Sequence, residues 1–429
     1  MFLSPGVKQK LVGVTVLLVI FVILGSLVVF GRPQNPDFVV YEAQAQKIFE
    51  DAKSQFERIR NVTLPSDIKL YVYTKQQAVD QWSKNPSSLD TSSILRQENI
   101  YKGLFLMSEN DSLDSVVAEW VASWTAVTIG NEIYVIYENF QPWNLPDAEA
   151  ILIHELTHVW QADLPASTSY DVDRAHNALI EGDAVYMSDY YKAQYNNRAV
   201  SKVVDYTGNL PAVIDVFRLN SVHPSVSDTV TKLNWFPYTA GKIFVSTLVG
   251  DDGWDRLNRC YTPTYLPSTT EQIIHPNKYF AGETAKPTFA PTPADDSWIR
   301  IHSSYGYASD TYGEYFIYVM LSQWLNDSQA KQAATGWGGD NFTYYEKNFD
   351  FLFTWNITWD SIQDALEFNQ AFLDLLNLAQ ANPQGSNTWF TNGRYLTLTW
   401  DPNTDSTLIV CSTNLTVMDS TFFYLAIQG

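Results

Sequence analysis

The stretch AEAILIHELTHVW, residues 148–160, decides how the rest of the chain is interpreted. Its apolar residues recur at helical spacing and no glycine or proline interrupts it, so it predicts a helix with one side in the core. Within it, His154 and His158 stand four positions apart. Residues at this spacing lie on one face of a helix, one turn above the other. Both imidazoles can therefore bind the same metal ion.

Glu155 follows the first histidine and completes the pattern His-Glu-x-x-His. In this pattern the histidines are zinc ligands, and the glutamate reaches a water molecule on the metal and acts as a general base. The pattern is short and also arises by chance on buried helices. A third ligand is therefore needed to support a metal site.

The candidate third ligand is Glu181, which lies 23 residues after His158 and begins the sequence Glu-Gly-Asp-Ala. This separation leaves room for a loop and an antiparallel helix that presents Glu181 to the metal. Together with both histidines it would form a three-ligand catalytic zinc site, with water in the fourth position. The alternative is a solvated glutamate at the start of a helix.

These residues resemble the gluzincin metallopeptidases, in which H-E-x-x-H is followed by a glutamate on a second helix. The zinc aminopeptidases of that clan carry E-G-x-A at this point, and residues 181–184 are similar to it. The resemblance implies one catalytic zinc ion and peptide-bond hydrolysis. Thermolysin-like members place a partner aspartate four positions after the ligand glutamate, where this chain has Val185. Asp183 is then the candidate partner of a ligand, with Asp189 as the alternative.

A further motif lies in residues 233–249, LNWFPYTAGKIFVSTLV, where a helix is predicted to open at Pro237. Gluzincin aminopeptidases carry Y-x-x-G at a similar distance after the glutamate ligand, and that tyrosine stabilises the oxyanion. By this resemblance, Tyr238 is the candidate donor to the developing oxyanion. The alternative is one more core tyrosine among the 25 in the chain.

Residues 270–279, TEQIIHPNKY, resemble a segment of poorly characterised prokaryotic membrane-associated H-E-x-x-H proteins. That group also shows H-E-L-T-H, E-G-D-A, F-P-Y-x-x-G and G-W-G-G-D, all present here, the last at residues 336–340. By this resemblance, His275 could donate to the oxyanion, and Glu271 could bind a substrate amine or orient His275. A hydrogen-bonded lock of the loop is the alternative, and the group brings little known function.

Near the N-terminus, residues 11–30 form an apolar run of 20 residues without a charge. As a helix this run would cross a bilayer's hydrocarbon core, about 30 Å thick. Lys8 and Lys10 precede it, which places the N-terminus in the cytoplasm and the remainder outside. A cleaved signal peptide is the alternative, but no clear small-x-small site follows. We therefore expect a retained single-pass anchor in the cell membrane, with an extracellular catalytic part.

An exterior location agrees with six Asn-x-Ser/Thr sequons, which make the chain a candidate glycoprotein. The candidate asparagines are Asn61, Asn110, Asn326, Asn341, Asn356 and Asn414. Cys260 and Cys411 could pair in an oxidising compartment or could both be buried thiols. The formal net charge of −20 disfavours nucleic acid as a partner. The oligomeric state is not indicated.

The expected fold class is α+β: a thermolysin-like, gluzincin catalytic domain with an N-terminal transmembrane helix and a smaller C-terminal α+β region. Its small sheet includes residues 131–137, and in gluzincins a strand at this position forms the rim of the cleft; an ordinary buried strand is the alternative. The predicted divisions are 1–32 cytoplasmic tip and anchor, 33–110 N-terminal α/β part, 111–282 zinc-binding catalytic region, 283–297 linker or surface loop, and 298–429 C-terminal region.

Together these patterns predict a membrane-anchored, extracytoplasmic zinc metallopeptidase acting on a peptide or protein substrate. The aminopeptidase segment G-x-M-E-N that binds a free amine is not found in the sequence, which favours an endopeptidase. One alternative is a catalytically silent gluzincin-like surface module for binding or assembly. Another is a zinc hydrolase that acts on non-peptide material of the cell envelope.

Overall fold

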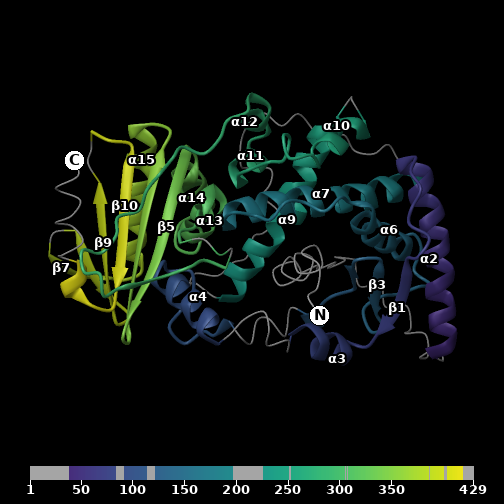
Figure 1. The fold of residues 1–429 in the computed structure, drawn as a ribbon, viewed down its shortest axis with the longest axis horizontal. Helices are drawn as coiled ribbons and strands as arrows, with labels where there is room; N and C mark the ends of the chain where they lie inside the picture. Colours follow the sequence, from purple (N-terminus) through teal and green to yellow (C-terminus); the bar gives the residue numbers. More distant parts are fainter. Residues whose placement is uncertain are drawn as a thin grey trace.

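The computed structural model describes residues 38–83, 91–113, 121–196, 226–250, 253–304, 306, 308–385, 387–400 and 403–418. Within these ranges two sheets lie at opposite ends of the molecule, and long helices run between them (Figure 1). The candidate metal ligands lie on α6 (Asp147–Trp160), which packs against the smaller sheet, and on α7 (Tyr170–Tyr195), which packs against α6.

The smaller sheet contains β1 (Lys69–Tyr73), β2 (Ala126–Ile129) and β3 (Glu132–Ile136) in the order β1-β3-β2. β1 is parallel to β3, and β2 is antiparallel to it. Helices α2 (Phe38–Arg60) and α6 (Asp147–Trp160) share a hydrophobic core with β3. The predicted N-terminal part and the predicted zinc-binding region therefore contribute strands to one sheet. A short helix, α3 (Lys75–Ala78), and a π-helical turn (Val79–Ser83) follow β1.

Two long helices, α7 (Tyr170–Tyr195) and α9 (Val226–Val249), pack side by side in the middle of the molecule (Figure 1). Ser169 caps the start of α7 by accepting a hydrogen bond from the Val172 amide. The helix predicted to open at Pro237 begins earlier, at Val226, and the proline lies inside it. The shorter helices beside this pair are α4 (Thr91–Gly103), α10 (Trp254–Arg259), α11 (Thr270–Ile274) and α12 (Pro276–Ala281).

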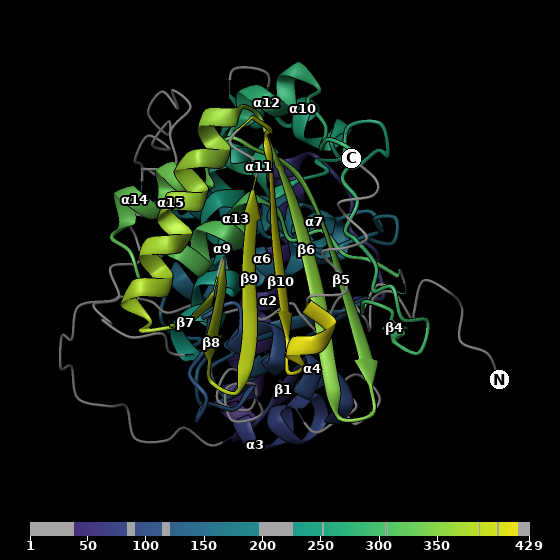
Figure 2. The same ribbon diagram turned by 90° about the vertical axis from the view of Figure 1, so that its left-hand side faces the viewer.

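The larger sheet is antiparallel and has seven strands, seen face-on in Figure 2. In sheet order these are β4 (Ile299–Ile301), β5 (Trp337–Lys347), β6 (Asp350–Trp359), β10 (Ser406–Ser412), β9 (Arg394–Trp400), β8 (Thr388–Thr391) and β7 (Asn382–Gly385). One face packs on helices α13 (Gly313–Leu321), α14 (Asp327–Ala334) and α15 (Ile362–Leu378). The predicted C-terminal α+β region therefore contains the larger of the two sheets.

Asp340, at the start of β5, joins this sheet to α13. Its buried carboxylate accepts hydrogen bonds from the amides of Tyr312 and Gly313 and from the indoles of Trp337 and Trp355. Four donors satisfy a charge that burial would otherwise destabilise. The sequence GWGGD thus begins a long strand and fixes the first turn of α13.

The prediction for the N-terminus is corrected. Across the described ranges, no helix is both long enough and apolar enough to cross a bilayer. The structure therefore does not support the predicted N-terminal transmembrane helix, nor the single-pass cell-membrane localisation that depends on it. Residues 11–30 themselves lie outside the described residues.

Other features of the sequence have clear positions. Residues 283–297, predicted as a linker or surface loop, run along the larger sheet: the Lys286 amide donates to the Gly338 carbonyl, and the Thr288 hydroxyl to Thr358. Cys260 and Cys411 are both buried free thiols, so the second alternative for the cysteines is the one observed.

Candidate metal centre

Helices α6 and α7 bring the three predicted ligand side chains together. The Nε2 atoms of His154 and His158 are 3.1 Å apart. Glu181 Oε2 lies 3.3 Å from the first and 3.5 Å from the second. His154 and Glu181 are almost completely buried, and His158 is mostly so. Three potential ligand atoms thus form a nearly equilateral triangle.

This triangle fits a tetrahedral metal ion. Ligand bonds of about 2.0–2.1 Å at tetrahedral angles place neighbouring ligand atoms about 3.3–3.4 Å apart. Glu181 Oε2 is buried and faces the Nε2 atoms of both histidines. Two histidines and a glutamate are also a donor set of catalytic zinc sites. The residues present therefore match the chemistry that the motif predicts.

The three side chains are strongly coupled by charge. Burial lowers the pKa of His158, but the combined influence of Glu181, Glu155 and Gln161 outweighs it and raises the pKa to about 9. Burial raises the pKa of Glu181, but His158 and His154 outweigh it and lower the pKa to about 2. The carboxylate of Glu181 thus stays ionised and available to a cation over the physiological range.

Glu155 lies on α6 beside this triangle and is buried. The hydroxyl of Thr128 donates a 2.6 Å hydrogen bond to its Oε2. Thr128 belongs to β2, which is the edge strand of the smaller sheet. The strand expected at 131–137 is the central strand β3, so of its two interpretations the structure favours an ordinary buried strand over the rim of the cleft. Residues 126–129 were missed because four residues give too little alternation to identify a strand.

Tyr238 on α9 lies against the same centre. Its ring is nearly parallel to that of His154, with centroids 6.4 Å apart. Its hydroxyl is buried. Burial, then the nearby carboxylates of Glu181 and Glu155, raise the pKa of this phenol. The structure therefore places a protonated hydroxyl beside the candidate ligands.

Gln161, which the sequence analysis did not identify, sets the orientation of His158. The amide nitrogen of Gln161 donates to the Ile180 carbonyl at 2.8 Å, and a carbonyl can only accept. Gln161 Oε1 must then face His158 Nδ1, 3.0 Å away. A proton on Nδ1 leaves the lone pair of Nε2 free to bind a metal.

Asp183, predicted as the partner of a ligand, is connected to His158 only through Tyr261 and Gln161 in the observed hydrogen bonds. The Asp183 carboxylate accepts a hydrogen bond from the Tyr261 hydroxyl at 2.8 Å. The Tyr261 hydroxyl oxygen in turn accepts a hydrogen bond from Gln161 Nε2 at 2.9 Å. Asp183 also forms a buried ion pair with Arg60. The Arg60 guanidinium lies over the rings of Trp160 and Trp254, and its Cζ atom is 4.2 and 4.3 Å from the two ring centroids. The alternative, Asp189, is a surface residue paired with Lys242.

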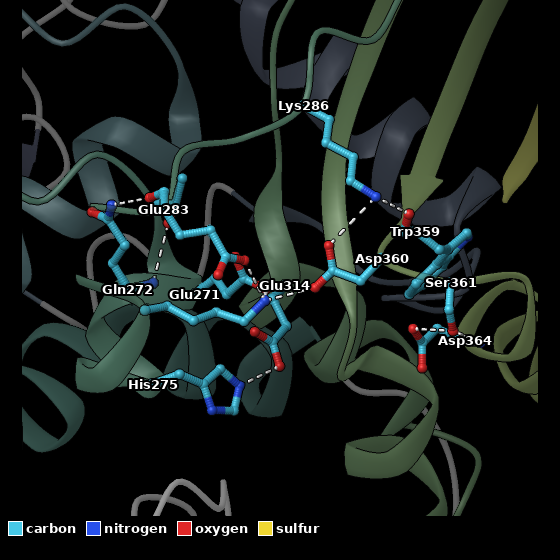
Figure 3. A network of polar contacts seen from close by, with 12 residues as sticks. Glu271, Gln272, His275, Glu283, Lys286, Glu314, Trp359, Asp360, Ser361 and Asp364 are labelled. Atoms are coloured by element: carbon cyan, nitrogen blue, oxygen red, sulfur yellow. Dashed lines mark hydrogen bonds and ion pairs between the residues drawn. The ribbon is translucent and has the colours of Figure 1, made fainter. Parts of the chain in front are cut away.

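His275 and Glu271 form part of a separate polar network, shown in Figure 3. His275 Nε2 lies 3.0 Å from the buried carboxylate of Glu314 on α13. Lys278 reaches Glu271 at 2.6 Å, and Glu283 and Asp360 at 2.7 Å each. These contacts occupy the groups that an oxyanion or a substrate amine would need. They are the contacts expected of the hydrogen-bonded lock.

The oxygens of Glu271, Glu283 and Asp360 lie within 4.8 Å of one another, close enough to be considered as a second metal site. The ammonium group of Lys278 bonds to all three carboxylates. Lysine is therefore the cation of this cluster.

Two of the predicted sequon asparagines face each other across neighbouring strands. Asn341 on β5 pairs with Asn356 on β6. Asn341 Oδ1 accepts from the Ala290 amide, and Asn356 Nδ2 donates to the Phe289 carbonyl. Both amides thus fasten residues 289–290 to the larger sheet.

Comparison with known proteins adds little functional information. Residues 302–418, which carry most of the larger sheet, match a family model described as a domain of unknown function (DUF8575). No curated protein matches the chain. A solved structure from Chloroflexus aurantiacus, described as a "putative hydrolase with a novel fold", is 14% identical, with a TM-score of 0.34. The similarity covers 66% of this chain and 98% of that one.

Proposed function

We propose that the chain is a zinc-dependent metallopeptidase of the gluzincin type. The observation that carries the proposal is the triangle of His154 Nε2, His158 Nε2 and Glu181 Oε2, with sides of 3.1–3.5 Å. The H-E-x-x-H motif supplies two corners of this triangle, the glutamate on the next helix supplies the third, and the nearby tyrosine agrees with the same interpretation.

A zinc ion held by the three ligands would polarise the scissile carbonyl and lower the pKa of a water molecule. Glu155, next to His154 on α6, is the general base in this proposal: its carboxylate accepts a proton from the attacking water and later donates it to the leaving amine. The hydrogen bond from Thr128 fixes one carboxylate oxygen, which leaves the other to handle the proton.

Tyr238 is the candidate donor to the oxyanion that develops as the carbonyl is attacked. Its buried hydroxyl lies near the carboxylates of Glu181 and Glu155, beside the candidate ligands. A preoriented donor of this kind stabilises the transition state more than the bound substrate.

The edge strand β2 supports an extended peptide as the substrate. β2 pairs with β3 along one side, and its Thr128 reaches Glu155. An extended peptide can add to a free strand edge through main-chain hydrogen bonds. Such binding does not need a free terminus, so we propose endopeptidase activity.

The test is zinc content together with cleavage of a peptide library by the full chain, beside Glu155→Gln. We expect one zinc ion per chain in both proteins and cleavage only in the unsubstituted one. Glu50→Gln, an exposed position on α2, is the matched control and should cleave normally. A chain that binds no zinc when purified without chelator would overturn the proposal.

The same experiment addresses the two other functions that the sequence allows. Zinc binding without peptide cleavage, followed by release of product from an envelope extract, would identify a hydrolase of non-peptide material. Zinc binding with neither activity would indicate a silent binding or assembly module. Both outcomes would contradict the peptidase proposal.

A further inference from the structure

A cavity of about 240 Å³ lies at the start of α7, away from the candidate metal centre. Asp171 lies in its wall, ten residues before Glu181. At 1.5 Å per residue, this separation is about 15 Å along the helix. The wall carries two carboxylates and six serine or threonine residues, and the described lining includes no lysine, arginine or histidine. Such a wall offers oxygen ligands almost exclusively.

Asp171 has one oxygen engaged and one free. Its Oδ1 accepts from the amide of Thr270 at 2.9 Å and from the Thr270 hydroxyl at 2.6 Å. Its Oδ2 is buried and has no hydrogen-bond donor in the described part of the chain. Only 1% of the residue is exposed. A buried carboxylate oxygen without a partner costs free energy unless a ligand satisfies it.

Gly313 makes room for this carboxylate. A Cβ added at Gly313 would lie 1.8 Å from Asp171 Oδ1, and the residue has a φ of +79°. Only glycine combines this backbone conformation with the space that Asp171 needs. The first turn of α13 is thus shaped to hold the Asp171 side chain in place.

Asp310, the second carboxylate in the wall, is arranged in the same way. Its Oδ1 accepts from the amides of Tyr170 and Thr311, at 2.7 and 2.8 Å. Both of these hydrogen bonds end on the same carboxylate oxygen. The loop that carries Asp310 is held against α7 because the Asp171 amide donates to the Thr311 carbonyl. Two carboxylates, each with one engaged oxygen, therefore share one cavity.

The titratable groups around the cavity are acidic. Burial is the main cause that raises the pKa of Asp171 to about 8, and the nearby Asp340 and Glu314 carboxyl groups raise it further. Burial, with Asp340 and Asp173, raises the pKa of Asp310 to about 7. Among the described residues, neither carboxylate forms an ion pair with a lysine or an arginine. A bound cation would supply the missing positive charge.

We propose that this cavity is a binding site for a divalent cation of calcium size, with Asp171 Oδ2 and Asp310 Oδ2 as its protein ligands. Calcium takes six to eight oxygen ligands in flexible geometry, which hydroxyl groups and water can complete here. The wall lacks the imidazole and thiolate ligands that zinc prefers. The ion would tie together the start of α7, the segment at Thr270 and the loop at Asp310, and its binding does not depend on the proposed peptidase activity.

The experiment is a calcium titration of the full chain after removal of metals, followed by calorimetry at pH 7 and by thermal unfolding. We expect one saturable calcium ion per chain and a higher unfolding temperature. Asp171 is largely protonated at this pH, so binding should release protons, measured as a difference between buffers of unlike ionisation enthalpy. Asp171→Asn and Asp310→Asn should each weaken binding by about tenfold or more.

The matched control is Asp67→Asn, which removes the same charge from an exposed position and should bind calcium normally. Asp310 is only partly buried, so Asp310→Asn carries the test if Asp171→Asn does not fold. The proposal would be overturned if the chain bound no calcium or if binding did not saturate. It would also be overturned if both variants bound calcium as well as the control does. Equal binding would reflect only the net charge of −20.

Discussion

Gly182 on α7 and Gly241 on α9 lie in backbone contact. A Cβ added to Gly182 would be 2.3 Å from the carbonyl carbon of Gly241, and a Cβ added to Gly241 would be 2.1 Å from the Ala178 carbonyl oxygen. Gly182 follows Glu181, and Gly241 lies about one turn after Tyr238. The glycines of Glu-Gly-x-Ala and Tyr-x-x-Gly thus share one physical purpose: they let two helices approach closely enough to place the tyrosine beside the glutamate.

Gly241→Ala should separate the two helices. Because the added methyl group meets backbone rather than a flexible side chain, we expect a loss of at least about 1–3 kcal/mol in the free energy of unfolding. Peptidase activity should fall as well, since Tyr238 moves away from Glu181. Urea unfolding measures the first effect. Thr247→Ala, on the same helix, is the control and should change stability by less than about 0.5 kcal/mol. Equal stability of both variants would contradict the close contact.

Gln161→Leu should weaken zinc binding without unfolding the protein. The substitution keeps much of the side-chain volume but removes the acceptor that fixes the proton on His158 Nδ1. Loss of such a partner typically lowers metal affinity by about 10–100-fold. Competition with a chromophoric chelator measures the affinity. Gln141→Leu, at an exposed position, should bind zinc normally. Unchanged affinity in Gln161→Leu would show that packing alone orients His158.

The metal-free protein should lose stability as pH rises from about 4 towards 8. Burial raises the folded-state pKa of Asp171 and Glu271 to about 8 and that of Asp310 to about 7. Unfolded carboxyl groups titrate near pH 4, so between these values the folded state binds more protons than the unfolded state. Stability then falls with pH, by up to about 1.4 kcal/mol per pH unit for each group.

Urea unfolding at several pH values, with chelator present, checks this sign. Asp171→Asn cannot titrate at this position, so its stability should fall less steeply between pH 5 and pH 8. A slope identical to that of the unsubstituted protein would show that Asp171 titrates normally in the folded state.

The sequence was most informative where local pattern and chemistry agree. The helix of His154 and His158 and the helix of Glu181 could be expected from their apolar residues and their motifs together. β5 was missed because it opens with Gly338 and Gly339, residues typical of turns. Those glycines are needed because Lys286 packs against both.

Long-range contacts account for what the sequence could not show about the site. The role of Gln161 depends on Tyr261, 100 residues away along the chain. Thr128 reaches Glu155 only because β2 lies at the edge of a sheet whose order is not sequential. His275 has the residue type of a catalytic group, and only its contact with Glu314 indicates a structural use. Residue types alone identified the candidate ligands, whereas the hydrogen-bond partners of the site residues could be found only from the fold.

Thr128→Val should separate catalysis from metal binding. Valine has nearly the shape of threonine but cannot donate to Glu155, so the carboxylate loses the hydrogen bond that orients it. If Glu155 is the general base, the turnover rate should fall by about 10–100-fold, within the contribution of a positioned base. Zinc content should stay at one ion per chain, because Thr128 does not touch the three ligand atoms in any contact observed here. Thr128→Ser retains the hydroxyl and should recover most of the rate. A rate unchanged in Thr128→Val would show that Glu155 is oriented by its helix alone, whereas loss of zinc would show that β2 supports the metal ligands themselves.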